Sequence, residues 1–216
     1  MLRLGILISG SGTNLQAIID SIEAGRLNAG VAVVISDRPG AYGIERAKKH
    51  NIQALVIDRA LYNGKEPFEE SLIKTLKEKE VGLVVCAGFM RLFSPLFVKA
   101  FPMRIMNIHP SLLPAFSGLN THKNVIAYGA RFSGCTAHFV DEGLDTGPII
   151  IQAAVPVMEG DTPETLAQRI HIEEHRIYPQ AIRLFADGKL KIIGRRVIIK
   201  DHPFADSALE NPKVTI

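Results

Sequence analysis

Short apolar runs alternate with amphipathic stretches along the first half of the chain. The runs have the length of buried strands, and the stretches between them carry apolar residues at helical spacing. We expect strands at residues 2–8, 31–36, 54–57, 83–86 and 104–109, and helices at 13–24, 42–50 and 67–79, with a short helix from Ser94-Pro95. Strands that alternate with helices in this way form parallel sheets covered on both faces.

The pattern changes after residue 109. A loop over 110–120 leads to a short helix at 121–128, and two longer β segments, 131–140 and 149–157, flank a loop rich in Gly and Asp. A helix follows from the Thr162-Pro163 pair to Ala186. We therefore predict one α/β domain over 1–188, with a mostly parallel, Rossmann-like sheet, helices on both faces and an antiparallel or mixed C-terminal part. Residues 189–216 are expected to be a C-terminal extension, loosely held from residue 201 onward.

Composition narrows the class of protein. The 216 residues are 47% hydrophobic and 22% charged, which excludes wholesale disorder, and no apolar run is long enough to cross a bilayer. Cys86 and Cys135 are far apart, so we expect inert buried thiols in a reducing, cytoplasmic compartment. The net charge of +3 is too mild to indicate nucleic acid but suits a small anionic substrate.

The first glycine-rich turn, Ser9–Asn14, joins the first strand to the first helix. Glycines let an anion approach the backbone, and a helix N-terminus offers free N–H groups, so we predict a phosphate site. Thr13-x-x-Gln16 has capping-box spacing. A dinucleotide is less favoured, because Leu15 stands at the third glycine position, although Asp37 remains a candidate for holding a ribose. The structural alternative is that the glycines only make the turn.

Two polar side chains emerge together from the strand at 104–109. Asn107 and His109 point the same way because side chains alternate along a strand, and Pro110 keeps His109 extended. An Asp from the loop 141–148, brought beside this histidine, would favour the imidazolium, and Asp145 is the candidate. Such a trio can polarise a carbonyl and move a proton. Ser111 lacks the glycines of a nucleophile elbow, so a serine hydrolase is not expected.

His171-x-x-Glu174-His175 matches a short pattern of zinc peptidases. Histidines four residues apart share a helix face. A five-residue match is weak, so we expect an amphipathic helix near a pocket and no metal.

Four segments, read together, carry a resemblance to a known family. ISGSGTNLQAII, CAGFMRL, NIHPSLLP and HFVDEGLDTGPII, in this order between about residues 4 and 188, resemble the phosphoribosylglycinamide formyltransferases, the folate-dependent enzymes of purine synthesis. The resemblance implies transfer of a formyl group from 10-formyltetrahydrofolate, the co-substrate, to the amine of glycinamide ribonucleotide. It implies small-molecule partners and no nucleic acid or membrane, and leaves monomer and homodimer open.

The resemblance also implies roles for individual residues. The catalytic residues would be Asn107, His109 and Asp145. The phosphate-binding residues would be Gly12, Thr13 and Asn14. The folate-binding residues would be Phe89, Met90, Arg91, Leu92, Val140, Leu144 and Asp145. Other substrate-binding or supporting residues would be Lys65, Arg104, Thr136, His138 and Glu174, with Arg104 and Arg91 as candidates for the acidic tail of the folate and Glu174 for the ribose hydroxyls.

Departures and alternatives remain. Ser117 stands where the family leads us to expect proline, Asn120 where it leads us to expect histidine or an acid, and Lys65 near where some members carry an arginine. Similar motifs occur in formyltetrahydrofolate hydrolases and in enzymes that formylate initiator tRNA, which we expect to need additional domains. A non-catalytic nucleotide-binding module would keep the glycine turn without the geometry of the trio.

Overall fold

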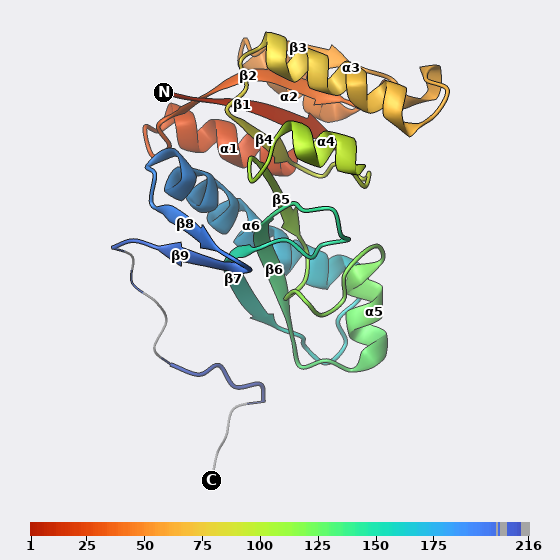
Figure 1. Cartoon of the computed structure of the whole chain (residues 1–216). Helices are drawn as coiled ribbons and strands as arrows, with labels where there is room; N and C mark the ends of the chain where they lie inside the picture. The colour runs from red at the N-terminus through yellow and green to blue at the C-terminus, as the bar shows by residue number, and fades with distance from the viewer. Residues whose placement is uncertain (202, 204–206, 213–216) are drawn as a thin grey trace.

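The computed structural model describes residues 1–201, 203 and 207–212. Within these residues the strands form one nine-stranded sheet in the order β3-β2-β1-β4-β5-β6-β7-β9-β8 (Figure 1). The strands are β1 (Leu2–Ile8), β2 (Ala29–Ser36), β3 (Ala54–Val56), β4 (Leu83–Cys86), β5 (Ile105–His109), β6 (Phe132–Phe139), β7 (Ile149–Pro156), β8 (Leu190–Ile193) and β9 (Arg196–Ile199). The helices are α1 (Thr13–Glu23), α2 (Tyr42–Lys49), a 3-10 turn at Arg59–Leu61, α3 (Lys65–Glu78), α4 (Pro95–Ala100), α5 (Thr121–Tyr128) and α6 (Pro163–Ala186).

Pairing in the sheet follows the prediction. β1 to β5 are parallel, whereas β6 is antiparallel to both β5 and β7. The mostly parallel sheet with an antiparallel C-terminal part is therefore confirmed. The order reverses between β1 and β4, and ligands of open α/β sheets bind beyond the carboxyl ends of the strands at such a point.

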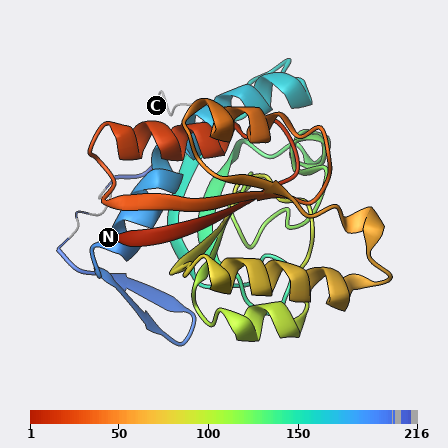
Figure 2. The same cartoon turned by 90° about the horizontal axis from the view of Figure 1, so that it is seen from above.

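Helices cover both faces of the sheet, as Figure 2 shows from above. Successive residues of β1 serve opposite faces, as the two-residue period of a strand requires. Ile6 and Ile8 join the core cluster that includes side chains of α1 and α6, whereas Leu7 joins the cluster that includes side chains of α3 and α4. Strands buried on both sides explain the continuous apolar runs in the sequence.

One local expectation is wrong, and one segment has more regular structure than we expected. The N-cap of α1 is Gly12, in the left-handed region (φ 71°), with no side-chain cap, so Thr13 and Gln16 form no capping box. In addition, β8 and β9 form an antiparallel hairpin where we expected only an extension, and β9 joins the sheet beside β7. Part of the segment expected to be loosely held (202, 204–206 and 213–216) lies outside the described residues.

The long helix α6 is tied directly to the centre of the sheet. The buried hydroxyl of Tyr178 lies 3.0 Å from the carbonyl oxygen of Cys86 and 2.9 Å from that of Met106, one on β4 and one on β5. Burial raises the pKa of this phenol, so it stays a donor. None of the helices in the described part of the chain is long and apolar enough to cross a membrane.

Candidate active site

A large cavity of about 1190 Å³ opens beyond the carboxyl ends of β1, β4 and β5. The loop after β1 supplies Ser9–Asn14, the loop after β4 supplies Gly88–Phe93, and the end of β5 supplies Asn107–Pro110. Loops at 118–122 and 140–146 and two residues of α6 complete the lining. Small-ligand pockets are usually about 300–1,000 Å³, so this cavity has room for more than one small molecule.

The loop after β1 combines free N–H groups with a close approach to a neighbouring helix. A Cβ on Gly12 would lie 2.7 Å from the Cα of Gly43, so only glycine fits there. The loop is tied to the one after β4, because the Ser9 N–H donates to the Gly88 carbonyl (3.1 Å) and the Met90 N–H donates to the Ser9 hydroxyl (3.1 Å). Gly12, Thr13 and Asn14 all line the cavity, with the N-terminus of α1 behind them.

Glu174 of α6 connects this loop to the opposite wall. Its buried carboxylate accepts hydrogen bonds from Asn14 Nδ2 and His171 Nδ1, both at 2.9 Å. Burial alone would raise the pKa of Glu174, but these hydrogen bonds lower it below its ordinary value. The hydrogen bond to Glu174 in turn raises the pKa of His171. Asn14 Oδ1 is buried and has no partner among the described residues.

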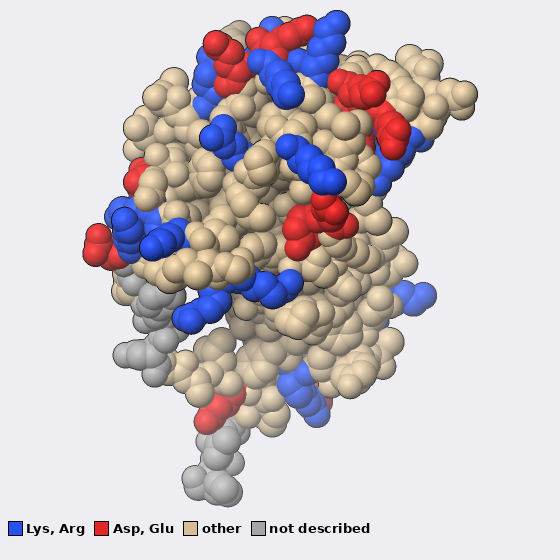
Figure 3. All heavy atoms as spheres, viewed as in Figure 1, with Lys and Arg blue, Asp and Glu red and all other residues tan. Residues whose placement is uncertain are grey.

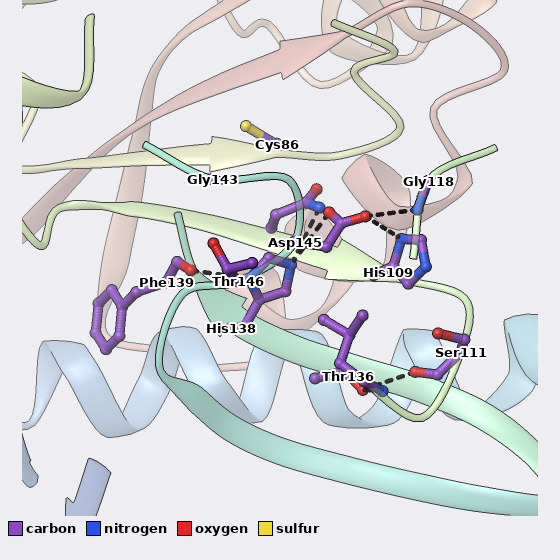
Figure 4. Close-up of polar contacts among 12 residues, drawn as sticks. Cys86, His109, Ser111, Gly118, Thr136, His138, Phe139, Gly143, Asp145 and Thr146 are labelled. Carbon is purple, nitrogen blue, oxygen red and sulfur yellow. Dashed lines mark hydrogen bonds and ion pairs between the residues drawn. The ribbon is translucent and has the colours of Figure 1, made fainter. Parts of the chain in front are cut away.

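His109 and Asp145 lie next to each other, as Figure 4 shows. The His109 Nδ1 atom is 3.3 Å from Asp145 Oδ2. The other ring nitrogen, Nε2, is 2.9 Å from the carbonyl oxygen of Phe116, so it carries a proton and donates. Both side chains are largely buried. The backbone N–H of Gly118 also donates to Asp145 Oδ2 (2.9 Å), so this carboxylate oxygen lies between two donors.

His138 of β6 fixes the orientation of the Asn107 amide. Its Nδ1 donates to the Phe139 carbonyl (2.8 Å), which leaves Nε2 as the acceptor for Asn107 Nδ2 at 3.3 Å. Burial lowers the pKa of His138, so the ring stays neutral and keeps this tautomer. No described residue accepts from the second N–H of Asn107, which borders the cavity. The amide therefore has one hydrogen free to donate to a ligand.

The loop after β6 holds Asp145 in place by backbone geometry. Asp145 itself lies in the left-handed region (φ 53°), which is costly for most residues other than glycine and is found at functional sites. At the base of the loop, a Cβ on Gly147 would meet the Phe139 carbonyl oxygen at 1.8 Å. Asp141 closes the loop by accepting from the Thr146 hydroxyl (2.6 Å) and the Gly143 N–H (3.0 Å).

Part of the cavity lining is apolar. Phe89, Met90, Leu92, Val140 and Leu144 line the cavity together with Arg91, and Lys65 borders it from the start of α3. Met90, Leu92 and Leu144 are exposed although they are apolar. Exposed apolar side chains that converge on a cavity are typical of a ligand site.

Three expected residues lie elsewhere. Arg104 is exposed directly before β5, at the opposite end of that strand from His109, and does not line the cavity. Asp37 is buried, does not line the cavity, and binds Arg91 through Oδ2. Thr136 is buried behind the site, where its hydroxyl donates to the Ser111 carbonyl (2.6 Å) and accepts from the Leu113 N–H (3.1 Å). It supports the loop after β5.

Sequence reasoning missed several lining residues, notably Arg38, His122 and His171. His122 Nδ1 is buried without a partner among the described residues. Arg38 follows the end of β2, a position that parallel topology could have indicated. No local pattern in the sequence indicated that His122 and His171 line one site. They come together only because α5, which carries His122, lies beside α6, which carries His171.

The residues of the HxxEH pattern make contacts with one another. The rings of His171 and His175 stack with centroids 6.3 Å apart, and His171 is bound to Glu174. The described residues contain no group of three or more His, Cys, Asp or Glu side chains that could hold a metal ion. Both cysteines are free and buried, and burial raises the pKa of Cys135 to about 12 and that of Cys86 further.

Charges of both signs are interspersed over the face shown in Figure 3, and neither sign forms a continuous area there. This distribution differs from the basic stripe that marks many nucleic-acid-binding domains.

Comparison with known proteins shows the class that this fold and site define. Residues 2–182 match the model of the formyl transferase family, and the chain belongs to that family. It is 41% identical over 191 residues to phosphoribosylglycinamide formyltransferase of Escherichia coli, and the match covers 88% of this chain and 90% of the relative. The crystal structure of glycinamide ribonucleotide transformylase 1 from Symbiobacterium toebii superposes with a TM-score of 0.92 at 57% identity, covering 93% of this chain and 95% of that one.

The chain also matches one part of much larger proteins. It is 47% identical over 191 residues to the trifunctional purine biosynthetic protein adenosine-3 of Drosophila pseudoobscura pseudoobscura. That match covers 88% of this chain but only 14% of the relative, so the chain spans a small part of the trifunctional protein's length.

Proposed function

We propose that the protein transfers a formyl group from 10-formyltetrahydrofolate to the amine of glycinamide ribonucleotide, giving formylglycinamide ribonucleotide and tetrahydrofolate. One observation carries the proposal. His109, Asp145 and the free N–H of Asn107 border one cavity, between a phosphate-type loop at Gly12–Asn14 and an apolar wall at Phe89–Leu92. The names of the relatives support the same reaction.

Each part of the cavity suits one part of the two substrates. The N-terminus of α1 and the N–H groups of Gly12–Asn14 suit the phosphate of the ribonucleotide. Glu174 is an acceptor for ribose hydroxyls, and the unpartnered Asn14 Oδ1 is a second acceptor beside it. The apolar wall suits the pteridine ring of the folate, with Arg91 and Lys65 near its acidic tail. Both substrates thus bring their reacting atoms toward the trio.

The trio performs the chemistry by stabilising developing charge. The amine nitrogen attacks the formyl carbon, and the carbonyl electron pair moves onto the formyl oxygen. The second N–H of Asn107 donates to that oxyanion, and the positive charge of a protonated His109, whose two ring nitrogens face Asp145 and the Phe116 carbonyl, stabilises it. Asp145 holds the imidazolium through Nδ1 and relays the proton lost by the attacking nitrogen, through water, toward the departing folate nitrogen. The carbon–nitrogen bond to the folate then breaks, and the carbonyl re-forms.

The decisive experiment measures tetrahydrofolate formation with and without glycinamide ribonucleotide. We expect formation of tetrahydrofolate to require the amine and to match the amount of formylated ribonucleotide one to one. Equal rates without the amine would instead indicate a formyltetrahydrofolate hydrolase. Asp145→Asn serves as the control for the site, because it keeps the size of the side chain while removing its charge. It should abolish turnover and leave binding of the ribonucleotide largely intact.

A further inference from the structure

A second, smaller hollow lies between α1 and α6, away from the carboxyl ends of the strands. Its volume is about 280 Å³. Its lining residues are Ala17, Ser21, Arg26, His175, Arg176, Pro179, Gln180 and Arg183. None of these residues lines the large cavity, so the hollow is a separate feature of the fold.

The hollow is strongly basic. Three arginines and one histidine line it, and no lining residue is acidic. Only Arg176 is compensated, because its Nη1 lies 2.7 Å from Glu173 Oε2. Arg26 and Arg183 are exposed and form no ion pair with any described residue. Two guanidinium groups therefore border this hollow without a counter-charge.

Two further features of the hollow are the ring of His175 and the carboxyl end of α1. His175 Nε2 is buried and has no partner among the described residues, and burial lowers the pKa of this ring, so His175 adds a polar group to the hollow but no positive charge. The carboxyl end of α1 would ordinarily repel an anion. Here the Ser21 carbonyl already accepts from the N–H groups of Arg26 (2.9 Å) and Leu27 (3.1 Å), which offsets that repulsion.

We propose that this hollow between α1 and α6 is a binding site for a phosphate-bearing small anion of about the size of a diphosphate. Guanidinium groups bind phosphate oxygens in pairs, and Arg26 reaches the hollow from the turn after α1 and Arg183 from α6. The volume is below the roughly 300–1,000 Å³ typical of drug-sized ligands, so it holds phosphate groups alone. If a nucleotide carries them, its base and sugar remain outside.

The test is a titration of the full ¹⁵N-labelled protein with inorganic pyrophosphate, followed by NMR. We expect saturable shifts of the amides of Ser21, Arg26 and residues 175–183. Amides of residues 10–14 report separately on the large cavity and distinguish binding there. In Arg26→Gln/Arg183→Gln the shifts at the hollow should need at least about a hundredfold more pyrophosphate, roughly tenfold for each charged contact.

Arg131→Gln is the matched control, because Arg131 is exposed and lines neither cavity. It should bind pyrophosphate as the unmodified chain does. If a nucleoside diphosphate saturates the same shifts at a similar concentration, the result supports a site that recognises the phosphate groups of both inorganic pyrophosphate and a nucleotide. The proposal is overturned by shifts that sodium chloride of equal ionic strength reproduces, or by unchanged binding in Arg26→Gln/Arg183→Gln.

Discussion

Single hydrogen bonds decide which atoms carry protons at the proposed catalytic trio. The Phe139 carbonyl sets the tautomer of His138, and His138 in turn holds the amide of Asn107. The Phe116 carbonyl sets the proton on His109 Nε2, which leaves Nδ1 to face Asp145. Because each group is oriented by a neighbour, we expect the proposed trio of Asn107, His109 and Asp145 to act as a unit.

Removing two members of the trio together should therefore lower kcat little more than removing one of them. Asn107→Ala and His109→Ala should each lower kcat by about a hundred- to a thousandfold, since each removes a group that we propose stabilises the oxyanion. The double variant should fall far short of the product of the two losses. Steady-state kinetics of all three variants measure this, with the exposed Asn28→Ala as the control. Losses that multiply would contradict a shared role.

His171 and Glu174 predict a dependence of stability on pH. Hydrogen bonding to Glu174 raises the pKa of His171 above the ordinary value of 6.5. The pair thus contributes stability that is fully present below pH 6.5 and is lost as the pH rises through the raised value. Urea unfolding gives the free energy of unfolding of the unmodified chain and of His171→Ala. The difference between these two free energies should shrink as the pH rises through this window. A difference that grows with pH would contradict it.

At the scale of elements, α6 connects the chemistry to the core. The helix begins at a capping box in which Thr162 and Thr165 satisfy each other's backbone, and an Asp161–Arg169 ion pair (2.8 Å) braces the first turns. One turn further on lie His171 and Glu174, beside the cavity. Tyr178 then reaches β4 and β5. The position of Glu174 therefore depends on how α6 packs on the sheet.

Tyr178→Phe tests that connection. Removal of the hydroxyl leaves the carbonyls of Cys86 and Met106 without these hydrogen bonds, and should lower the free energy of unfolding by about 1–3 kcal/mol. Tyr128→Phe is the matched control, because Tyr128 is 81% exposed and should change stability little. Chemical denaturation measures both. Equal stabilities of the two variants would show that the buried hydroxyl contributes nothing.

At the scale of the whole molecule, the sheet brings the two halves of the site together. The reversal of strand order between β1 and β4 places the glycine loop beside the loop after β4, and antiparallel β6 returns His138 to Asn107. The β8–β9 hairpin lies at the far edge of this sheet. It pairs with β7 through Ile149 and Arg196, and Arg195 Nη2 donates to the Thr146 carbonyl (2.7 Å).

We predict that residues 1–188 fold and act without the hairpin. Its apolar side chains are only partly buried against the core, so truncation should cost about 2–4 kcal/mol of stability rather than abolish folding. Turnover should persist, because every residue of the trio remains. Arg195→Gln in the full chain removes only the hydrogen bond to the Thr146 carbonyl and keeps the hairpin. Comparison with the truncated chain therefore separates the effect of that contact from the effect of losing the hairpin. Failure of the truncated chain to fold would show that the domain extends to Ile199.

Local patterns in the sequence determined much of the fold. The alternation of strand and helix follows from residue periodicity, and the shared direction of Asn107 and His109 follows from the two-residue period of a strand. The hairpin was missed although its signal is present. Short segments rich in apolar residues, LKII and RVII, lie on either side of the turn at Gly194, but so short a segment is recognised only when a sheet edge is there to pair with it.

Only the tertiary structure decided which distant residues meet. Asn14 and Glu174 are 160 positions apart, and their hydrogen bond exists because α1 and α6 pack on the same face of the sheet. The partner of Asp37 Oδ2 is Arg91 for the same kind of reason, because the loop after β4 lies beside the end of β2 in the folded chain. Local sequence determines the direction and type of an element, whereas contacts between elements depend on packing of the whole chain, which no local pattern encodes.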